Sequence, residues 1–244
     1  MRYFFRVEYD GSRYCGWQRQ PHGTGVQEIV EKTLSVILRV TCTVVGAGRT
    51  DKGVHVRALG VHFDVGLPID IRRCQLAMNA VLPDDISIYN LQPVAPDFHA
   101  RFSAVRRRYC YYMVFRKSPL LYKRAWMLFR SIDWEGVEQN IPALIGTHDF
   151  TTFCAAGSCT ITNICSVSTA MLERRGECFV FTIEADRFIY KMVRSIVGTL
   201  IDIGSGVATG SMQAMLESKN RLLAGTTAPA CGLVLDNVFY QGLL

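Results

Sequence analysis

The order of predicted strands and helices repeats along the chain, and this repeat limits the possible folds more than any other feature. Apolar residues alternate, or recur at helical spacing, in the order strand, helix, strand, strand, helix, strand within both halves. These elements fall at residues 2–9, 25–39, 40–45, 54–65, 70–80 and 86–92, and again at 106–115, 133–145, 161–172, 178–185, 188–203 and 232–240. Two split β-α-β units in tandem follow from this pattern.

We therefore predict an α+β fold of two tandem β-α-β-β-α-β halves, ferredoxin-like or RRM-like, with mostly antiparallel sheets flanked by helices. The halves are 1–105 and 106–244, and an insert at 207–230 adds a short helix and a loop to the second. We find no linker that would separate them as independent domains.

Two helix ends carry recognisable signals. Thr24 is predicted as an N-cap, and Gln27, three residues on, completes a capping box. At the other end of the chain, Gly204-Ser205-Gly206 is predicted to end the helix of residues 188–203. Glycine reaches the left-handed C-cap conformation without a Cβ penalty.

The composition is that of a packed globular protein with a modest basic excess. Hydrophobic residues make up 49% of the 244 residues and charged residues 20%. No apolar run is long enough to cross a membrane, and charges interrupt the N-terminal apolar stretch, so we expect neither a membrane span nor a signal peptide. The 27 Lys and Arg residues outnumber the 21 Asp and Glu residues, which favours a polyanionic partner.

The cysteines indicate a reduced, cytoplasmic protein without a metal. There are nine, none lies in a C-x-x-C motif, and an odd number cannot all pair within one chain. Cys154, Cys159 and Cys165 come nearest to a metal cluster, but the histidines supply no matching ligand spacing. We expect cytoplasmic localisation, no metal and no cofactor.

A glycine-rich loop at residues 46–55 is the most informative segment. It lacks the glycine spacing of a dinucleotide loop and the Lys-Ser/Thr ending of a P-loop. What remains is one carboxylate, Asp51, flanked by Arg49 and Lys52 on a loop whose glycines allow close approach of a substrate. The alternative is that Asp51 is only a turn residue, because Asp and Gly are ordinary turn chemistry.

Residues 98–112 concentrate arginine and aromatic side chains. Strand alternation places Tyr109 and Tyr111 on one face, with Arg108 on the other. Arginine for phosphates and aromatic rings for bases is the usual combination in RNA grooves. A solvated basic edge strand above a tyrosine-rich core explains the same pattern.

The helix predicted at 188–203 has a buried apolar stripe and a basic face. Arg187, Lys191 and Arg194 recur on that face at three- and four-residue steps. A solvated face accounts for this spacing, whereas a functional role requires Arg194 to point at a carboxylate.

Together these segments resemble the tRNA pseudouridine synthase A (TruA) family nearly from end to end. GRTDKGVH resembles its catalytic loop, FHARFSA followed by RRYCYY its central strand, FIYKMVRSIVGTL its C-terminal helix, and CGLVLDNVFY its closing strand. The resemblance implies an active site made of protein alone, a homodimer, and uridines at positions 38 to 40 of the tRNA anticodon arm as targets.

The resemblance also implies roles for individual residues, with the active-site cleft between the two halves. Asp51 is the catalytic carboxylate, Tyr109 lies against the target base, and Arg194 is the ion-pair partner of Asp51. Leu233 or Leu235 is the apolar packing residue, and sequence does not choose between them. Contacts to the anticodon stem-loop are expected from Arg49, Lys52, His55, Arg101, Arg106, Arg107, Arg108, Tyr111 and Lys191. Lys52 departs from the Ala of many members, and we expect it to add a phosphate contact.

The reaction so implied breaks the N1–C1′ bond of uridine and forms a C5–C1′ bond, without a redox step. An ionised Asp51 would attack C1′ or C6, or stabilise positive charge at C1′, and these routes stay open. Tyr109 would stack on the base or remove the C5 proton, although a phenol pKa near 10 favours stacking.

Two other functions fit the residues alone. One is a catalytically silent RNA-binding module in which Asp51 is a turn residue. The other is a glycosidase that pairs Asp51 with Asp64 or Glu184 and releases free uracil.

Overall fold

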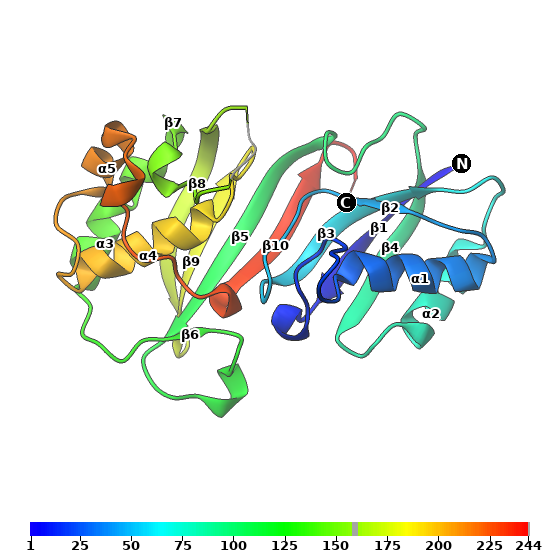
Figure 1. Ribbon diagram of the computed structural model, residues 1–244, viewed down its shortest axis with the longest axis horizontal. Helices are drawn as coiled ribbons and strands as arrows, with labels where there is room; N and C mark the ends of the chain where they lie inside the picture. Colours follow the sequence, from blue (N-terminus) through cyan, green and yellow to red (C-terminus); the bar gives the residue numbers. More distant parts are fainter. Residues whose placement is uncertain (158–160, 244) are drawn as a thin grey trace. The chain divides into compact units, whose positions relative to one another are not determined.

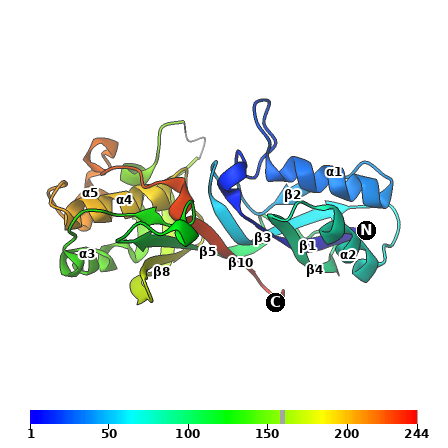
Figure 2. The same cartoon turned by 90° about the horizontal axis from the view of Figure 1, so that it is seen from below.

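Two units make up the chain in the computed structural model: Met1–Val105 together with Val234–Leu244, and Arg106–Leu233. Residues 1–157 and 161–243 are described. Cys159, one of the three cysteines considered above, lies outside the described residues. The elements of each unit are labelled in Figure 1, and Figure 2 gives the same ribbon turned by 90°.

The sheet of the first unit is built on β1 (Arg2–Tyr9) and β3 (His55–Asp64), which pair antiparallel. The other edge of β1 pairs antiparallel with β4 (Ile86–Val94). Helices α1 (Val26–Leu38) and α2 (Ile71–Val81) contact each other, and α2 also packs on β4. Nearly every residue of β1 is buried, Arg6 included, so its sequence does not follow a strict alternation of apolar and polar residues.

Two strands share the remaining edge of β3. The short strand β2 (Val44–Gly46) pairs antiparallel with its C-terminal part. The strand β10 (Leu233–Tyr240) pairs in parallel with its N-terminal part, where Val234 lies opposite His55 and Leu235 opposite Val56. One edge of β3 is therefore covered by the strand that precedes the Asp51 loop and by the strand that follows the second unit.

Side chains also attach β10 to the first unit. The buried Arg6 donates from Nη1 to Asn237 Oδ1 at 2.8 Å, and the Tyr240 hydroxyl donates to the Ala100 carbonyl at 2.8 Å. The sequence pattern assigned residues 232–240 to the half 106–244, whereas Val234–Leu244 belongs to the first unit. Periodicity predicts a strand but does not identify the strand with which it pairs.

The second unit has an antiparallel sheet in the order β5, β9, β8, β7. These strands are β5 (Ala104–Val114), β9 (Cys178–Ala185), β8 (Ile164–Arg175) and β7 (Gly146–Asp149), and β6 (Trp126–Met127) pairs in parallel with β5. The helices are α3 (Trp134–Asn140), α4 (Met192–Gly204) and α5 (Met212–Ser218). Both β6 and β7 are too short for a periodic signal, and neither was predicted.

Short 3₁₀ turns connect these elements. They are η1 (Gly11–Arg13), η2 (Pro119–Leu121), η3 (Pro142–Leu144), η4 (Thr151–Phe153), η5 (Arg221–Leu223) and η6 (Ala230–Gly232). The prediction of an α+β fold with mostly antiparallel strands is confirmed. Within residues 1–157 and 161–243, no helix is both long and apolar enough to cross a membrane.

The predicted capping box at the start of α1 is wrong. The N-cap is Gly25, and the N–H groups of Val26 and Gln27 donate to the carbonyls of Gly16 and Trp17 at 3.1 and 2.8 Å. A Cβ on Gly25 would lie 2.3 Å from the Gln18 carbonyl oxygen. The preceding loop thus takes the place of a capping side chain, and only glycine allows it to come so close.

Helix α4 begins later than predicted and ends as predicted. Its first residue is Met192, because Lys191 adopts a left-handed φ of 58° and Met192 N–H donates to Ile189. At its end, the N–H groups of Ser205 and Gly206 donate to the carbonyls of Ile201 and Ile203, and Gly206 has a φ of 71°.

Candidate active site

The loop that carries Asp51 connects β2 to β3 and is held on both sides of that residue. The Thr50 hydroxyl lies 2.6 Å from the Tyr9 hydroxyl and accepts a hydrogen bond from the Trp17 N–H at 3.1 Å. The Asp51 carbonyl accepts from the Val54 N–H at 3.2 Å. The backbone around the half-buried carboxylate is therefore fixed by β1 and by the loop before α1.

Two glycines make this arrangement possible. Gly53 has a φ of 81° at the third position of the turn from Asp51 to Val54, a conformation that glycine adopts without strain. Gly16 has a φ of 87°, and a Cβ there would lie 2.1 Å from the Thr50 carbonyl oxygen. Asp51 does begin a tight turn, as the alternative interpretation held, but that turn is built into the core contacts of the first unit.

The charged neighbours of Asp51 differ from His55 in exposure. Arg49 and Lys52 are exposed on the loop, where a polyanion can reach them. His55 is buried, and its Nδ1 accepts from the Gly11 N–H at 3.1 Å. In the structure His55 holds the η1 turn against β3, and its predicted contact with RNA stays a prediction.

In the second unit, Tyr109 lies on β5 opposite Ile183 of β9 and is half-buried. Phe188 meets its ring edge-on, with the centroids 5.0 Å apart and the planes at 89°. This contact fixes the orientation of the Tyr109 ring. Sequence analysis did not single out Phe188.

The three consecutive arginines of β5 have acidic or carbonyl partners and are not a purely solvated edge. Arg108 forms an ion pair with the buried Glu184, and Arg106 Nη1 lies 3.7 Å from the other oxygen of the same carboxylate. Arg107 Nη1 donates to the Asp186 carbonyl at 2.6 Å. Glu184 thus serves as the shared countercharge of Arg106 and Arg108.

Arg194 lies in the first turn of α4 and is held by a loop from the 207–230 insert. Its Nε donates to the Ala228 carbonyl at 2.8 Å, and the Ala228 N–H donates back to the Arg194 carbonyl at 3.0 Å. The buried Asp202 accepts from the Thr226 N–H at 2.7 Å, which fixes the same loop. The sequence predicted only a short helix and a loop in this insert, because no periodic pattern marks a loop that orients a side chain.

The predicted roles of Lys191 and of the two leucines of β10 stay predictions. Lys191 Nζ lies 4.9 Å from the centroid of the Tyr190 ring, a cation–π contact. Leu233 and Leu235 are both buried, at 6% and 2% exposure, and lie two residues apart on one face of β10, so burial does not choose between them.

Tyr111 requires a correction, because it is a core residue and not an RNA-facing one. Its side chain is 0% exposed, and its hydroxyl donates to the Pro229 carbonyl at 2.8 Å. Burial raises the pKa of this phenol well above its ordinary value. A Cβ on Gly232 would lie 2.7 Å from the ring, so the η6 turn covers Tyr111 closely.

The pairing of Asp51 with Asp64 in the glycosidase alternative finds no support. Asp64 ends β3 whereas Asp51 precedes it, so the ten-residue strand separates them by about 30 Å. Glycosidase carboxylates lie roughly 5–10 Å apart. Arg2 also holds Asp64 in a bidentate pair and lowers the pKa of that carboxyl.

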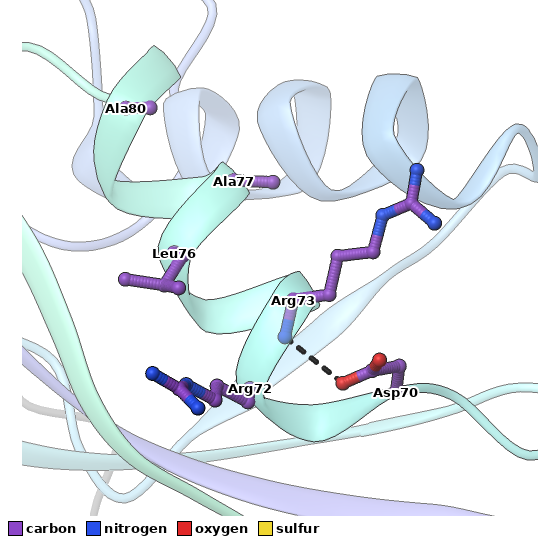
Figure 3. A pocket seen from close by; sticks show the side chains of 6 residues that line it. All are labelled: Asp70, Arg72, Arg73, Leu76, Ala77 and Ala80. Atoms are coloured by element: carbon purple, nitrogen blue, oxygen red, sulfur yellow. Dashed lines mark hydrogen bonds between the residues drawn. The ribbon is translucent and has the colours of Figure 1, made fainter.

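A shallow hollow on α2 contains none of the candidate catalytic residues. It measures about 470 Å³ and is lined by Asp70, Arg72, Arg73, Leu76, Ala77 and Ala80 (Figure 3). The Asp70 carboxylate accepts from the Arg73 N–H at 3.0 Å and so caps the helix.

Among the described residues, no group of three or more cysteine, histidine or acidic side chains could hold a metal ion. Cys154 and Cys165 are free thiols, and burial raises the pKa of Cys165 to about 12.

Comparison with known proteins identifies the class. The family model described as tRNA pseudouridine synthase matches residues 6–103 and 141–241, so the chain belongs to the tRNA pseudouridine synthase family, whose members are isomerases. Among its relatives are proteins named tRNA pseudouridine synthase A. That of Bacteroides thetaiotaomicron is 42% identical over 243 residues, which are 98% of this chain and 90% of the relative. That of Bacteroides fragilis is 41% identical over 242 residues, covering 98% and 96%, and that of Azobacteroides pseudotrichonymphae is 39% identical over 240 residues, also covering 98% and 96%.

Proposed function

We propose that this protein converts uridine to pseudouridine at positions 38 to 40 of the tRNA anticodon arm, with Asp51 as the catalytic carboxylate. One observation carries the proposal. The chain belongs to this family, and the backbone of its Asp51 loop is fixed before Asp51 by the hydrogen bonds of Thr50 and after it by the turn to Val54. A rigid backbone around one carboxylate suits a reaction in which that group must meet a sugar carbon at close range.

The proposed chemistry begins with an extruded uridine whose base leaves the stack. Extrusion costs a few kcal/mol, and the exposed Arg49 and Lys52 are suited to hold the displaced phosphates. Ionised Asp51 then attacks C1′ or C6, or stabilises the cation at C1′, while the N1–C1′ bond breaks. The detached uracil turns over and C5 bonds to C1′, which releases Asp51 from any covalent adduct. The C5 proton leaves and N1 takes up a proton. Atoms balance without an added oxidant, reductant or cofactor.

Arg194 is the proposed ion-pair partner of Asp51. The bond from its Nε to Ala228 fixes the plane of the guanidinium, so the terminal nitrogens can meet both oxygens of a carboxylate at once. Such a pair favours the ionised form of the acid, which the reaction needs.

Tyr109 is proposed to stack on the target base. The edge-on contact with Phe188 supports this role, since it orients the ring. If the hydroxyl served as the base, the Tyr109→Phe variant would lose turnover, whereas stacking alone would spare it.

We also propose the finer architecture and the assembly. The order β1, α1, β2, β3, α2, β4 supports a ferredoxin-like first unit, and the order β5, α3, β8, β9, α4 supports a related second one. A homodimer in the cytoplasm is proposed from the family resemblance, and light scattering of the purified protein tests the dimer.

The deciding experiment uses tRNA transcripts that carry tritium at C5 of uridine. Pseudouridine formation releases tritium, a silent RNA-binding module releases none, and a glycosidase releases labelled uracil. We expect the wild type to release tritium and Asp51→Asn to release none while retaining its fold and its affinity for tRNA. Full turnover by Asp51→Asn, or uracil as the product, would overturn the proposal.

A further inference from the structure

Phe102 is a large aromatic side chain that is exposed to solvent. It is 76% exposed, in the turn between β4 and β5 of the first unit. Single exposed apolar residues are common and carry no meaning alone. Phe102, however, lies in a hydrogen-bonded turn and packs against the ring of His99.

The backbone of this turn is fixed by its own side chains. His99 Nδ1 accepts from the N–H groups of Arg101 and Phe102, at 3.1 and 3.3 Å. The Ser103 hydroxyl accepts from the His99 N–H at 2.9 Å, and the Ser103 N–H donates to the His99 carbonyl at 2.8 Å. These four hydrogen bonds fix the backbone on both sides of Phe102.

Below Phe102, two imidazole rings continue inward to the sheet. The rings of Phe102 and His99 have centroids 4.4 Å apart at 31°, and those of His99 and His62 lie 4.8 Å apart. His62 is buried on β3, where its Nδ1 accepts from the Ala100 N–H at 3.0 Å. Phe102 is thus the outermost ring of a column that rests on a core strand.

A cation lies beside the outermost ring. The guanidinium carbon of the exposed Arg101 is 5.6 Å from the centroid of Phe102. A rigid exposed ring with an adjacent guanidinium is the combination that proteins use to stack a nucleobase and to contact its phosphate.

We propose that Phe102 is a stacking platform for an unpaired base of the RNA substrate, with Arg101 contacting a neighbouring phosphate. This inference rests on the proposed function and adds a binding residue that is remote from the reaction. His55 and His62 lie seven residues apart on β3, or about 23 Å. Since the Asp51 loop leads into His55, Phe102 contacts a nucleotide other than the one that reacts.

The test compares affinities for an anticodon stem-loop RNA, measured by fluorescence polarisation at several salt concentrations. We expect Phe102→Ala and Phe102→Leu to weaken binding by about 5- to 100-fold, and Phe102→Trp to bind like the wild type. Leucine keeps apolar bulk but lacks a flat π face, so it separates stacking from simple hydrophobic contact. Phe129→Ala removes a second ring that is 75% exposed, in the other unit, and should leave the affinity unchanged.

The salt dependence of binding distinguishes the contribution of the Phe102 ring from that of the Arg101 charge. Phe102→Ala should leave the slope of log affinity against log salt unchanged. Arg101→Gln should make that slope less steep by the amount that corresponds to the loss of about one phosphate contact.

Three results would overturn the platform. They are wild-type affinity in Phe102→Ala, full affinity in Phe102→Leu, and a change of oligomeric state in Phe102→Ala by light scattering, which would make the ring a protein contact. Failure of the proposed function looks different, because the wild type itself would then release no tritium.

Discussion

Arg194 and Ala228 are joined by two hydrogen bonds that run in opposite directions. Arg194 Nε donates to the Ala228 carbonyl at 2.8 Å, and the Ala228 N–H donates to the Arg194 carbonyl at 3.0 Å. A guanidinium held at Nε presents its remaining edge in one plane, which lysine cannot do.

Arg194→Lys should therefore lower kcat/KM for tRNA by about 10²-fold, the loss typical of one oriented donor, and Arg194→Ala should lower it further. Single-turnover tritium release measures the chemical step, and circular dichroism checks the fold. Equal activity of Arg194→Lys and the wild type would show that the fork geometry does not matter.

Gly198→Ala should disturb the same arginine from the same face of α4, one turn further along the helix. A Cβ there would lie 1.8 Å from the Thr226 carbonyl oxygen, so the loop that contains Ala228 must shift. We expect the free energy of unfolding to fall by about 1–3 kcal/mol and kcat to fall with it. Gly206→Ala is the control, because its backbone is strained but its Cβ meets nothing, so stability should fall without a loss of kcat.

Thr50→Val should loosen the loop of Asp51 while keeping its volume. The variant loses the Tyr9 hydroxyl contact and leaves the Trp17 N–H without its acceptor. Urea denaturation should show a loss of about 1–2 kcal/mol, and kcat should fall about 10-fold at unchanged tRNA affinity. Tyr9→Phe removes one of the two contacts and should have the smaller effect on both measurements, and the reverse order would contradict this account.

His62 should make the protein less stable in acid. Burial, with Arg2 and His99 nearby, lowers the pKa of His62 to about 4, whereas an unfolded histidine titrates near 6.5. Between these values the unfolded chain takes up a proton and the folded chain does not, so the free energy of unfolding falls as pH drops from 6.5 to 4, by roughly 2–3 kcal/mol.

Denaturation at pH 7.0 and 4.5 measures this effect. His62→Gln keeps an acceptor for the Ala100 N–H and has no titrating ring, so it should lose less stability between the two pH values. An identical loss in both proteins would assign the pH dependence to other groups.

Ser195→Ala should not harm the fold. Ser195 is 0% exposed, and its Oγ has no hydrogen-bond partner in the part of the chain that the structure describes. Removing an unsatisfied buried hydroxyl from a helix should raise the free energy of unfolding by about 1 kcal/mol. Thr199→Ala is the contrast, because its hydroxyl donates to the Ser195 carbonyl and accepts from the Gly225 N–H, and its loss should destabilise.

The sequence predicted the longer elements well and the contacts between distant segments poorly. Strands β1 and β9 and helix α1 follow from local periodicity, and their bounds match the predicted ranges closely. Strand alternation placed Tyr109 and Tyr111 on one face, but Tyr111 is sealed by Pro229 and Gly232, more than a hundred residues away. The contact between Ala228 and Arg194 could not be predicted either, because Ala228 lies in a loop that has no periodic pattern.

The parallel pairing of β10 with β3 has a consequence for biosynthesis. During translation the first unit can assemble β1, β2, β3 and β4, but the edge of β3 beside the Asp51 loop stays unpaired until residues 106–233 have left the ribosome. Maturation of the N-terminal loop therefore waits for the C-terminal strand, and a nascent chain arrested before β10 would expose that edge to chaperones.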